Sequence, residues 1–148
     1  MKTTTGYSGL QIALHWLVAI LILVAWLSGE GAEEAMEAVE EGGVTGFVPH
    51  VAFGLAILAL VVVRIPVRLS RGAPDAPGEP GSLAVKAAHW GHRLLYLLML
   101  AVPLGGASVF FLGLDLGEVH GLAANVLMLV VLGHALMALY HQYVLKDG

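Results

Sequence analysis

The chain has no cysteine and few charged residues, and both shortages narrow its chemistry. Without cysteine, disulfides, thiolate-held iron–sulfur clusters, c-type haem attachment and thiol catalysis are excluded. Charged residues make up 12% of the 148 residues, about half the roughly 25% typical of a soluble domain. Only seven residues are Lys or Arg, and the net charge is −4. The sequence therefore lacks the basic surface that nucleic-acid binding requires.

Apolar residues dominate instead, in runs long enough to cross a lipid bilayer. Hydrophobic residues make up 58% of the chain, and a membrane-spanning helix needs about 20 of them in succession. Four apolar segments, at about 10–28, 47–68, 83–112 and 119–145, are separated by stretches rich in Gly and Pro. We therefore expect a single transmembrane domain over residues 1–148, an all-α integral membrane four-helix bundle of up-down topology.

The first segment could instead be a cleavable signal peptide. His15 and Trp16 inside the segment, and Gly-Glu-Gly after it rather than an A-x-A-like site, favour retention. Trp26 and Trp90 lie near segment ends, as in an interfacial aromatic belt.

The charges are divided between the two sides of the predicted bundle. Because basic residues mark cytoplasmic loops, we expect both termini in the cytoplasm and the acidic loops outside. The basic residues of the expected cytoplasmic side are Lys2, Arg64, Arg68, Arg71, Lys86, Arg93 and Lys146. The acidic residues of the expected outer side are Glu30, Glu33, Glu34, Glu37, Glu40, Glu41, Asp115 and Glu118.

Seven histidines lie in or near the apolar segments, and four of them are matched in depth. His120 and His134 are 14 residues apart, about 40° short of four helical turns, so both leave one face with a rise of about 21 Å between them. His15 is at the depth of His134, and His50 is at the depth of His120. Opposed imidazoles at two levels predict axial-ligand pairs, His15/His134 and His50/His120, for the irons of two haems.

Other interpretations of the histidines stay open. They could be interhelical hydrogen-bonding residues of a non-redox structural bundle. A zinc or copper site has one suitable local spacing, His89-x-x-His92, but lacks clustered third and fourth ligands. Gly54, Gly121 and Gly133 near the paired histidines leave bare backbone for a flat macrocycle, although glycines are also common in ordinary membrane packing.

Several stretches carry a family resemblance that covers nearly the whole chain. They are Leu-Gln-Ile-Ala-Leu-His-Trp-Leu-Val at 10–18, Ala-His-Trp-Gly-His at 88–92, and the last segment with Asn125, His141 and Tyr-Val-Leu-Lys-Asp at 143–147. The chain resembles the bacterial cytochrome b561 family. The resemblance implies a four-helix cytochrome with two haem b groups in the bacterial inner (cytoplasmic) membrane, exchanging electrons with quinone. It also implies that His15, His50, His120 and His134 are the ligands.

The resemblance leaves two redox functions open. One is electron transfer between a periplasmic donor and the quinone pool, as in cytochrome b subunits of hydrogenases. The other is superoxide:ubiquinone oxidoreductase activity at the outer haem. The wholly acidic loop between the first two segments favours a basic protein partner and would repel superoxide. An amphipathic turn through residues 33–41 is the expected docking element, with a solvated loop as the alternative.

We expect the quinone to bind on the cytoplasmic side of the bundle, where the two termini lie. His141 lies two turns beyond His134 on nearly the same face and could donate the proton that accompanies quinone reduction, while Trp16 could wall the site. An interfacial histidine that reaches the headgroups is the alternative. Arg64 and Arg68 are expected to contact haem propionates, although the positive-inside signal could also explain them.

Overall fold

The computed structural model describes residues 4–44 and 46–147, which form a helical bundle. The helices are α1 (Gly9–Leu27), α2 (Gly29–Glu40), α3 (Pro49–Arg71), α4 (Leu83–Leu112), α5 (Gly117–Leu139) and the π-helical turn η1 (Tyr140–Leu145). Four spans are long and apolar enough to cross a membrane: α1, α3, α4 and α5 together with η1. The expected all-α bundle with four apolar spans is confirmed.

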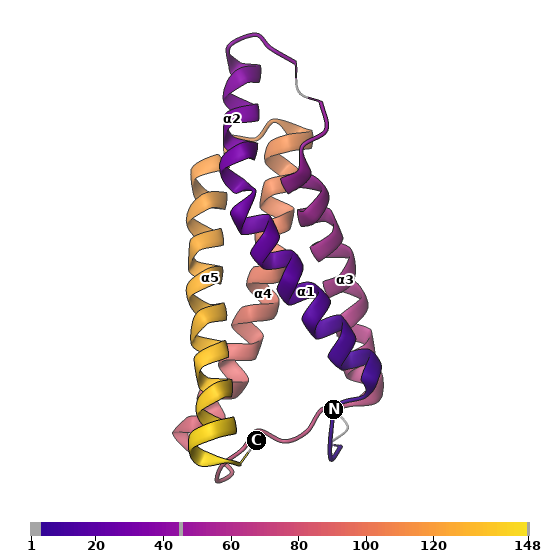
Figure 1. Ribbon diagram of the computed structural model, residues 1–148, viewed down its shortest axis with the longest axis vertical. Helices are drawn as coiled ribbons and strands as arrows, with labels where there is room; N and C mark the ends of the chain where they lie inside the picture. The colour runs from indigo at the N-terminus through magenta and orange to yellow at the C-terminus, as the bar shows by residue number, and fades with distance from the viewer. Residues whose placement is uncertain (1–3, 45, 148) are drawn as a thin grey trace.

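The long helices are arranged side by side, with both chain ends at the same end of the bundle (Figure 1). Helix α1 packs against α3, α3 against α4, and α4 against α5. Helix α2 lies at the opposite end, beyond the four spans (Figure 1). We call the end with the two termini the basic end, and the end with α2 the acidic end.

Local sequence explains where the spans begin and end. Ser8 starts α1 with a reciprocal capping box to Gln11, and the Ser82 hydroxyl accepts a hydrogen bond from the Val85 amide at the start of α4. Pro49 lies in the first turn of α3, where its missing N–H costs nothing. Gly113 ends α4 with φ of 67°, a left-handed conformation that glycine adopts without a side-chain clash.

Helix α2 is longer than the turn expected over residues 33–41. It follows α1 directly, with Ser28 ending one helix and preceding the next. Its half-buried residues Ala32, Met36 and Val39 recur at helical spacing, whereas its glutamates are exposed. The acidic segment is therefore an amphipathic helix of 12 residues anchored to the end of a membrane span.

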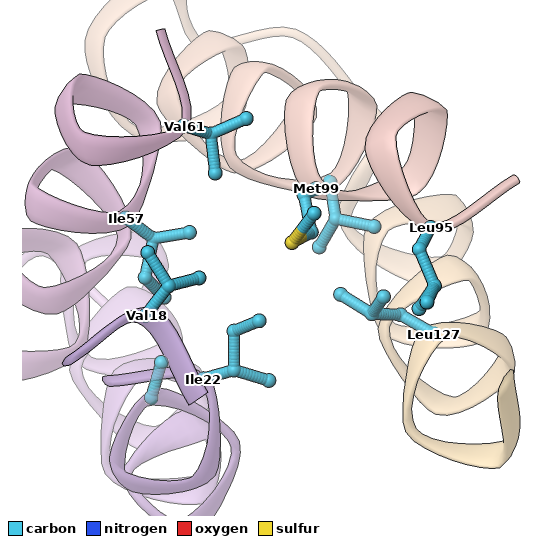
Figure 2. Close-up of a cluster of buried hydrophobic side chains, with 9 residues drawn as sticks. Val18, Ile22, Ile57, Val61, Leu95, Met99 and Leu127 are labelled. Carbon is cyan, nitrogen blue, oxygen red and sulfur yellow. The ribbon is translucent and has the colours of Figure 1, made fainter. Parts of the chain in front are cut away.

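An aliphatic cluster lies in the middle of the bundle, where buried side chains of α1, α3, α4 and α5 face one another (Figure 2). Val18 and Val61 are almost completely buried, and Leu127 is 5% exposed. Leu127 lies seven residues from both His120 and His134, so the cluster separates the two depths at which histidines were expected. Large apolar residues on the other faces are exposed, as a lipid-facing surface requires.

Candidate functional site

The acidic end brings together one histidine from α3 and one from α5. His50 lies in the first turn of α3 and His120 in the first turn of α5. Their ring centroids are 6.0 Å apart and their ring planes are inclined at 79°. The two helices start at the same end of the bundle, so residues 70 positions apart in sequence face each other across it.

Backbone carbonyls hold both rings of this acidic-end pair. The Nδ1 atom of His50 lies 2.7 Å from the Ala25 carbonyl oxygen, and Nδ1 of His120 lies 2.9 Å from the Val102 carbonyl oxygen. Because a carbonyl oxygen only accepts hydrogen bonds, each Nδ1 donates its proton. Each Nε2 of the neutral ring then keeps its lone pair, which is the state a metal ligand needs.

Gly106 on α4 makes room for the His120 ring, and sequence reasoning missed it. A Cβ atom on Gly106 would lie 2.7 Å from Cε1 of His120 and 3.2 Å from both ring nitrogens. By contrast, a Cβ on Gly54, Gly121 or Gly133 would have no such neighbour within 4 Å. The glycine with a steric role is therefore on the helix opposite the histidine, where local spacing gives no signal.

A cavity of about 60 Å³ lies beside the acidic-end pair. Apart from the two histidine rings its walls are mainly apolar, formed by Ile22, Ala25, Trp26, Gly54, Ile57, Met99, Val102, Pro103, Ala124, Leu127 and Met128. The cavity is much smaller than a porphyrin, so binding one there requires these side chains to move apart.

Trp26 lies at the end of α1 and is 47% exposed, which is compatible with the interfacial belt expected for it. It lines the cavity, and its indole Nε1 donates a hydrogen bond of 3.2 Å to Oδ1 of Asn125 on α5. Helices α1 and α5 make few direct contacts in the described part of the chain. The Trp26–Asn125 hydrogen bond therefore joins two helices that are otherwise loosely packed.

The basic end brings together three histidines rather than two. The ring centroids of His15 and His134 are 6.2 Å apart, with planes inclined at 54°. The ring of His92, from α4, lies closer to His134, at 5.3 Å. Across residues 4–44 and 46–147, none of these three rings has a hydrogen bond like those at the acidic end. The expected pair is therefore present in space, with a third imidazole beside it.

Two arginines lie next to this histidine group. The guanidinium carbons of Arg64 and Arg68 are 5.7 Å and 6.0 Å from the ring centroid of Tyr96, within the range of cation–π attraction. Arg64 is near enough to His15 and His134 for its charge to act on both rings. Neither arginine forms an ion pair with a carboxylate of the described residues, so both remain available to an anionic group.

Trp16 and His141 do not form one site through direct contact. The Trp16 ring packs edge-on against His15, with centroids 5.2 Å apart. His141 lies in the π-helical turn η1, and its Nδ1 forms a hydrogen bond of 2.7 Å with Oδ1 of Asp147. Sequence reasoning missed Asp147.

The two pairs fit a metal held inside a macrocycle better than a protein-only metal site. Two imidazoles that share one metal have centroids roughly 6 Å apart, given metal–nitrogen bonds of about 2.0–2.1 Å and about 1.1 Å from each nitrogen to its ring centre. Although three histidine rings lie near one another at the basic end, the described residues include no group of three or more His, Cys, Asp or Glu side chains that could hold a metal ion by themselves. His89 is exposed. A pair of histidines is sufficient only where the other four ligands come from a porphyrin.

Apolar spans that carry facing histidine pairs near both ends define a membrane protein suited to binding b-type haem. Residues 6–147 match the family described as prokaryotic cytochrome b561, and the chain belongs to that family. It is therefore a multi-pass membrane cytochrome b that takes part in electron transfer, and the expected family resemblance is confirmed.

Three relatives align with nearly the whole chain. Cytochrome b562 of Cereibacter sphaeroides is 44% identical over 157 positions, covering 99% of this chain and 94% of the relative. The probable superoxide oxidase CybB of Yersinia pestis is 34% identical over 174 positions, covering 96% and 92%. Cytochrome b561 homolog 1 of Escherichia coli is 25% identical over 167 positions, covering 96% and 93%.

Proposed function

We propose that this protein is a di-haem cytochrome b that transfers electrons between a periplasmic donor and the quinone pool. The observation that carries the proposal is the presence of two histidine pairs at opposite ends of one bundle, with ring separations of 6.0 Å and 6.2 Å. His50 and His120 would hold the haem of the acidic end, and His15 and His134 that of the basic end. Haem b, when bound, would supply a one-electron iron couple.

The side chains around the pairs have separate tasks. The carbonyls of Ala25 and Val102 hold the His50 and His120 rings through Nδ1, which leaves Nε2 of each ring as the atom that would bind iron. Arg64 and Arg68 would bind haem propionates at the basic end, because their charges are not used in ion pairs among the described residues. The aliphatic cluster of Figure 2 would place apolar side chains between the two haems.

The distribution of charges supports a proposed orientation. Arg64, Arg68, Arg71, Lys86 and Arg93 all belong to the basic end or its connecting loop, so this end is proposed to face the cytoplasm across a bacterial inner membrane. The acidic end, with α2, then faces the periplasm. The quinone is proposed to bind at the basic end, with Trp16 against His15 forming a wall and His141 donating a proton.

The periplasmic partner is proposed to be a basic one-electron redox protein. Helix α2 presents exposed glutamates and no basic residue. Such a surface raises the association rate of a positively charged partner and lowers that of an anion such as superoxide.

A haem count tests the main proposal. We expect the protein purified in detergent to contain two haem b per chain, with a b-type reduced-minus-oxidised spectrum. A folded preparation with no haem would leave a structural bundle as the remaining interpretation.

A ligand substitution tests the pairing. We expect His120→Ala to remove the haem of the acidic end and retain the other, so that the haem-to-protein ratio falls from two to one. His89→Ala, at an exposed position of α4, is the matched control and should retain both. An unchanged spectrum for His120→Ala would contradict the pairing.

Superoxide oxidation is a second candidate function, which the Yersinia relative favours. One difference from that relative speaks against this function. The alignment has 174 positions but includes only 96% of the 148 residues of this chain, so the relative has insertions that this chain lacks. Stopped-flow mixing of oxidised protein with superoxide tests it. Rapid haem reduction, accelerated when the six glutamates at 30–41 become glutamine, would establish this function instead of the protein-donor function.

A further inference from the structure

The last turn of the membrane helix departs from α-helical geometry. After Leu139 the chain continues as the π-helical turn η1, and the amides of Lys146 and Asp147 both donate to the His141 carbonyl. Lys146 has φ of 54°, the one positive φ of a non-glycine residue among the described positions. Such positions persist only where surrounding contacts hold them, and π-helical turns are frequent at functional sites.

This departure is what brings Asp147 to His141. In a regular helix, residues six positions apart point about 120° away from each other, so they do not meet. The wider turn and the left-handed residue at Lys146 reverse the chain, and Oδ1 of Asp147 reaches Nδ1 of His141 at 2.7 Å. The histidine side chain is 20% exposed and the aspartate side chain 38% exposed, so the carboxylate is the member of the pair that faces water.

The contact fixes which nitrogen of His141 can react. An ionised carboxylate only accepts hydrogen bonds, so Nδ1 of His141 is the donor. Nε2 is then the atom left to exchange a proton with a second group. A histidine held in this way can lose a proton from Nε2 and regain one from water without rotating.

We infer that Asp147 is a positioning residue that holds His141 as the proton donor to a quinone carbonyl at the basic end. The inference rests on the proposed function. Reduction of one quinone to a quinol consumes two electrons and two protons. The electrons arrive singly from the one-electron donor at the acidic end. For each proton delivered, the Nε2–H bond of the His141 imidazolium breaks, an O–H bond forms on the quinone, and water at the basic end reprotonates the ring.

The first experiment measures the protonated nitrogen of His141 directly. In the dithionite-reduced holoprotein labelled with ¹⁵N-histidine, we expect the neutral His141 ring to carry its proton on Nδ1, the signals being assigned by their loss in His141→Gln. In Asp147→Ala we expect the proton to move largely to Nε2. An unchanged Nδ1–H signal in Asp147→Ala would overturn the inference. The readout does not depend on turnover.

The second experiment follows reoxidation of the reduced holoprotein by a short-chain quinone in stopped flow. We expect Asp147→Ala to lower the maximal rate about 10- to 100-fold while the half-saturating quinone concentration changes less than twofold. Asp147→Asn, which keeps an acceptor oxygen but no charge, should give an intermediate rate. Asp75→Asn, an exposed carboxylate in the α3–α4 connection at the same end, should leave the rate unchanged.

The outcomes separate this inference from the proposed function. An unchanged maximal rate in Asp147→Ala, or a raised half-saturating concentration with an unchanged maximal rate, would overturn the positioning role while leaving the di-haem cytochrome intact. A wild-type protein that contains two haems but is not reoxidised by quinone would overturn the quinone proposal and with it this inference. Haem content of each variant, measured from the spectrum, shows that the comparison is made on loaded protein.

Discussion

Substituting Gly106 by alanine tests whether the His120 ring is seated as a haem ligand. The new Cβ would start 2.7 Å from Cε1, so the ring must retreat about 0.7 Å to reach an ordinary contact of 3.4 Å. That movement works against the 2.9 Å hydrogen bond from Nδ1 to the Val102 carbonyl. Overpacking costs about 1–3 kcal/mol, and loss of the hydrogen bond adds about 1 kcal/mol. The better helix propensity of alanine returns at most about 1 kcal/mol.

The substitution therefore destabilises the seat of the His120 ring by a net of about 1–3 kcal/mol. The rest of α4 is not destabilised, because alanine favours a helix more than glycine does. Disturbing the groups that orient a metal ligand lowers metal affinity about 10- to 100-fold. We therefore expect Gly106→Ala to need about 10- to 100-fold more haem to fill its acidic-end site, with the basic-end site unchanged. Haem titration of the apoprotein, followed by absorbance, measures this affinity.

The neighbouring glycine provides a matched control. A Cβ on Gly105 would lie 3.9 Å from Nδ1 of His120, which is an ordinary contact, so Gly105→Ala should bind two haems with wild-type affinity. The reasoning is refuted if Gly106→Ala and Gly105→Ala bind haem equally well, or if Gly106→Ala weakens the basic-end site instead.

Two further predictions concern the surroundings of the two pairs. A double-mutant cycle of Trp26→Phe and Asn125→Leu, measured by thermal unfolding in detergent, should give a coupling free energy of about 0.6–1.7 kcal/mol, because the two side chains share one interhelical hydrogen bond. A coupling free energy of zero would contradict this hydrogen bond. Arg64→Gln should lower the midpoint potential of the basic-end haem by roughly 50–100 mV, the effect of one charge about 10 Å away, with less change in the other haem. Optical redox titration measures both potentials, and Arg71→Gln, at an exposed position at the end of the same helix, is the control. Equal shifts for Arg64→Gln and Arg71→Gln would contradict the assignment of Arg64 to the basic-end haem.

Hydropathy predicted the four long helices because membrane spans are set by length and apolar composition, which are local properties of the chain. Helix α2 was underestimated, since Gly29 and Gly31 interrupt the pattern although the Ala, Met and Glu residues that follow favour a helix. Its direct continuation from α1 depends on Ser28 ending one helix as the next begins.

The histidine pairs were predictable in space because depth in a membrane bundle follows from position along each helix. The partners of those histidines were not. Gly106 and His92 meet their histidines across helix–helix contacts, and the packing that sets such contacts has no short-range sequence pattern. Asp147 reaches His141 through a π-helical turn and a left-handed residue, which break the 3.6-residue period that the prediction assumed. The ligand assignment itself stays a prediction.

The aliphatic cluster between the two histidine levels affects how charge can move through this protein. The buried side chains of the cluster are apolar among the described residues, so the cluster offers no proton relay of its own, whereas an electron could tunnel through it. A charge that crosses the whole membrane unaccompanied does work of about 2.3 kcal/mol per elementary charge per 100 mV, and a charge that moves between the two levels does part of it. In the proposed orientation, electron delivery from periplasm to cytoplasm would therefore be electrogenic. The difference in reduction potential between the proposed donor and quinone would then have to exceed the work done against an interior-negative membrane.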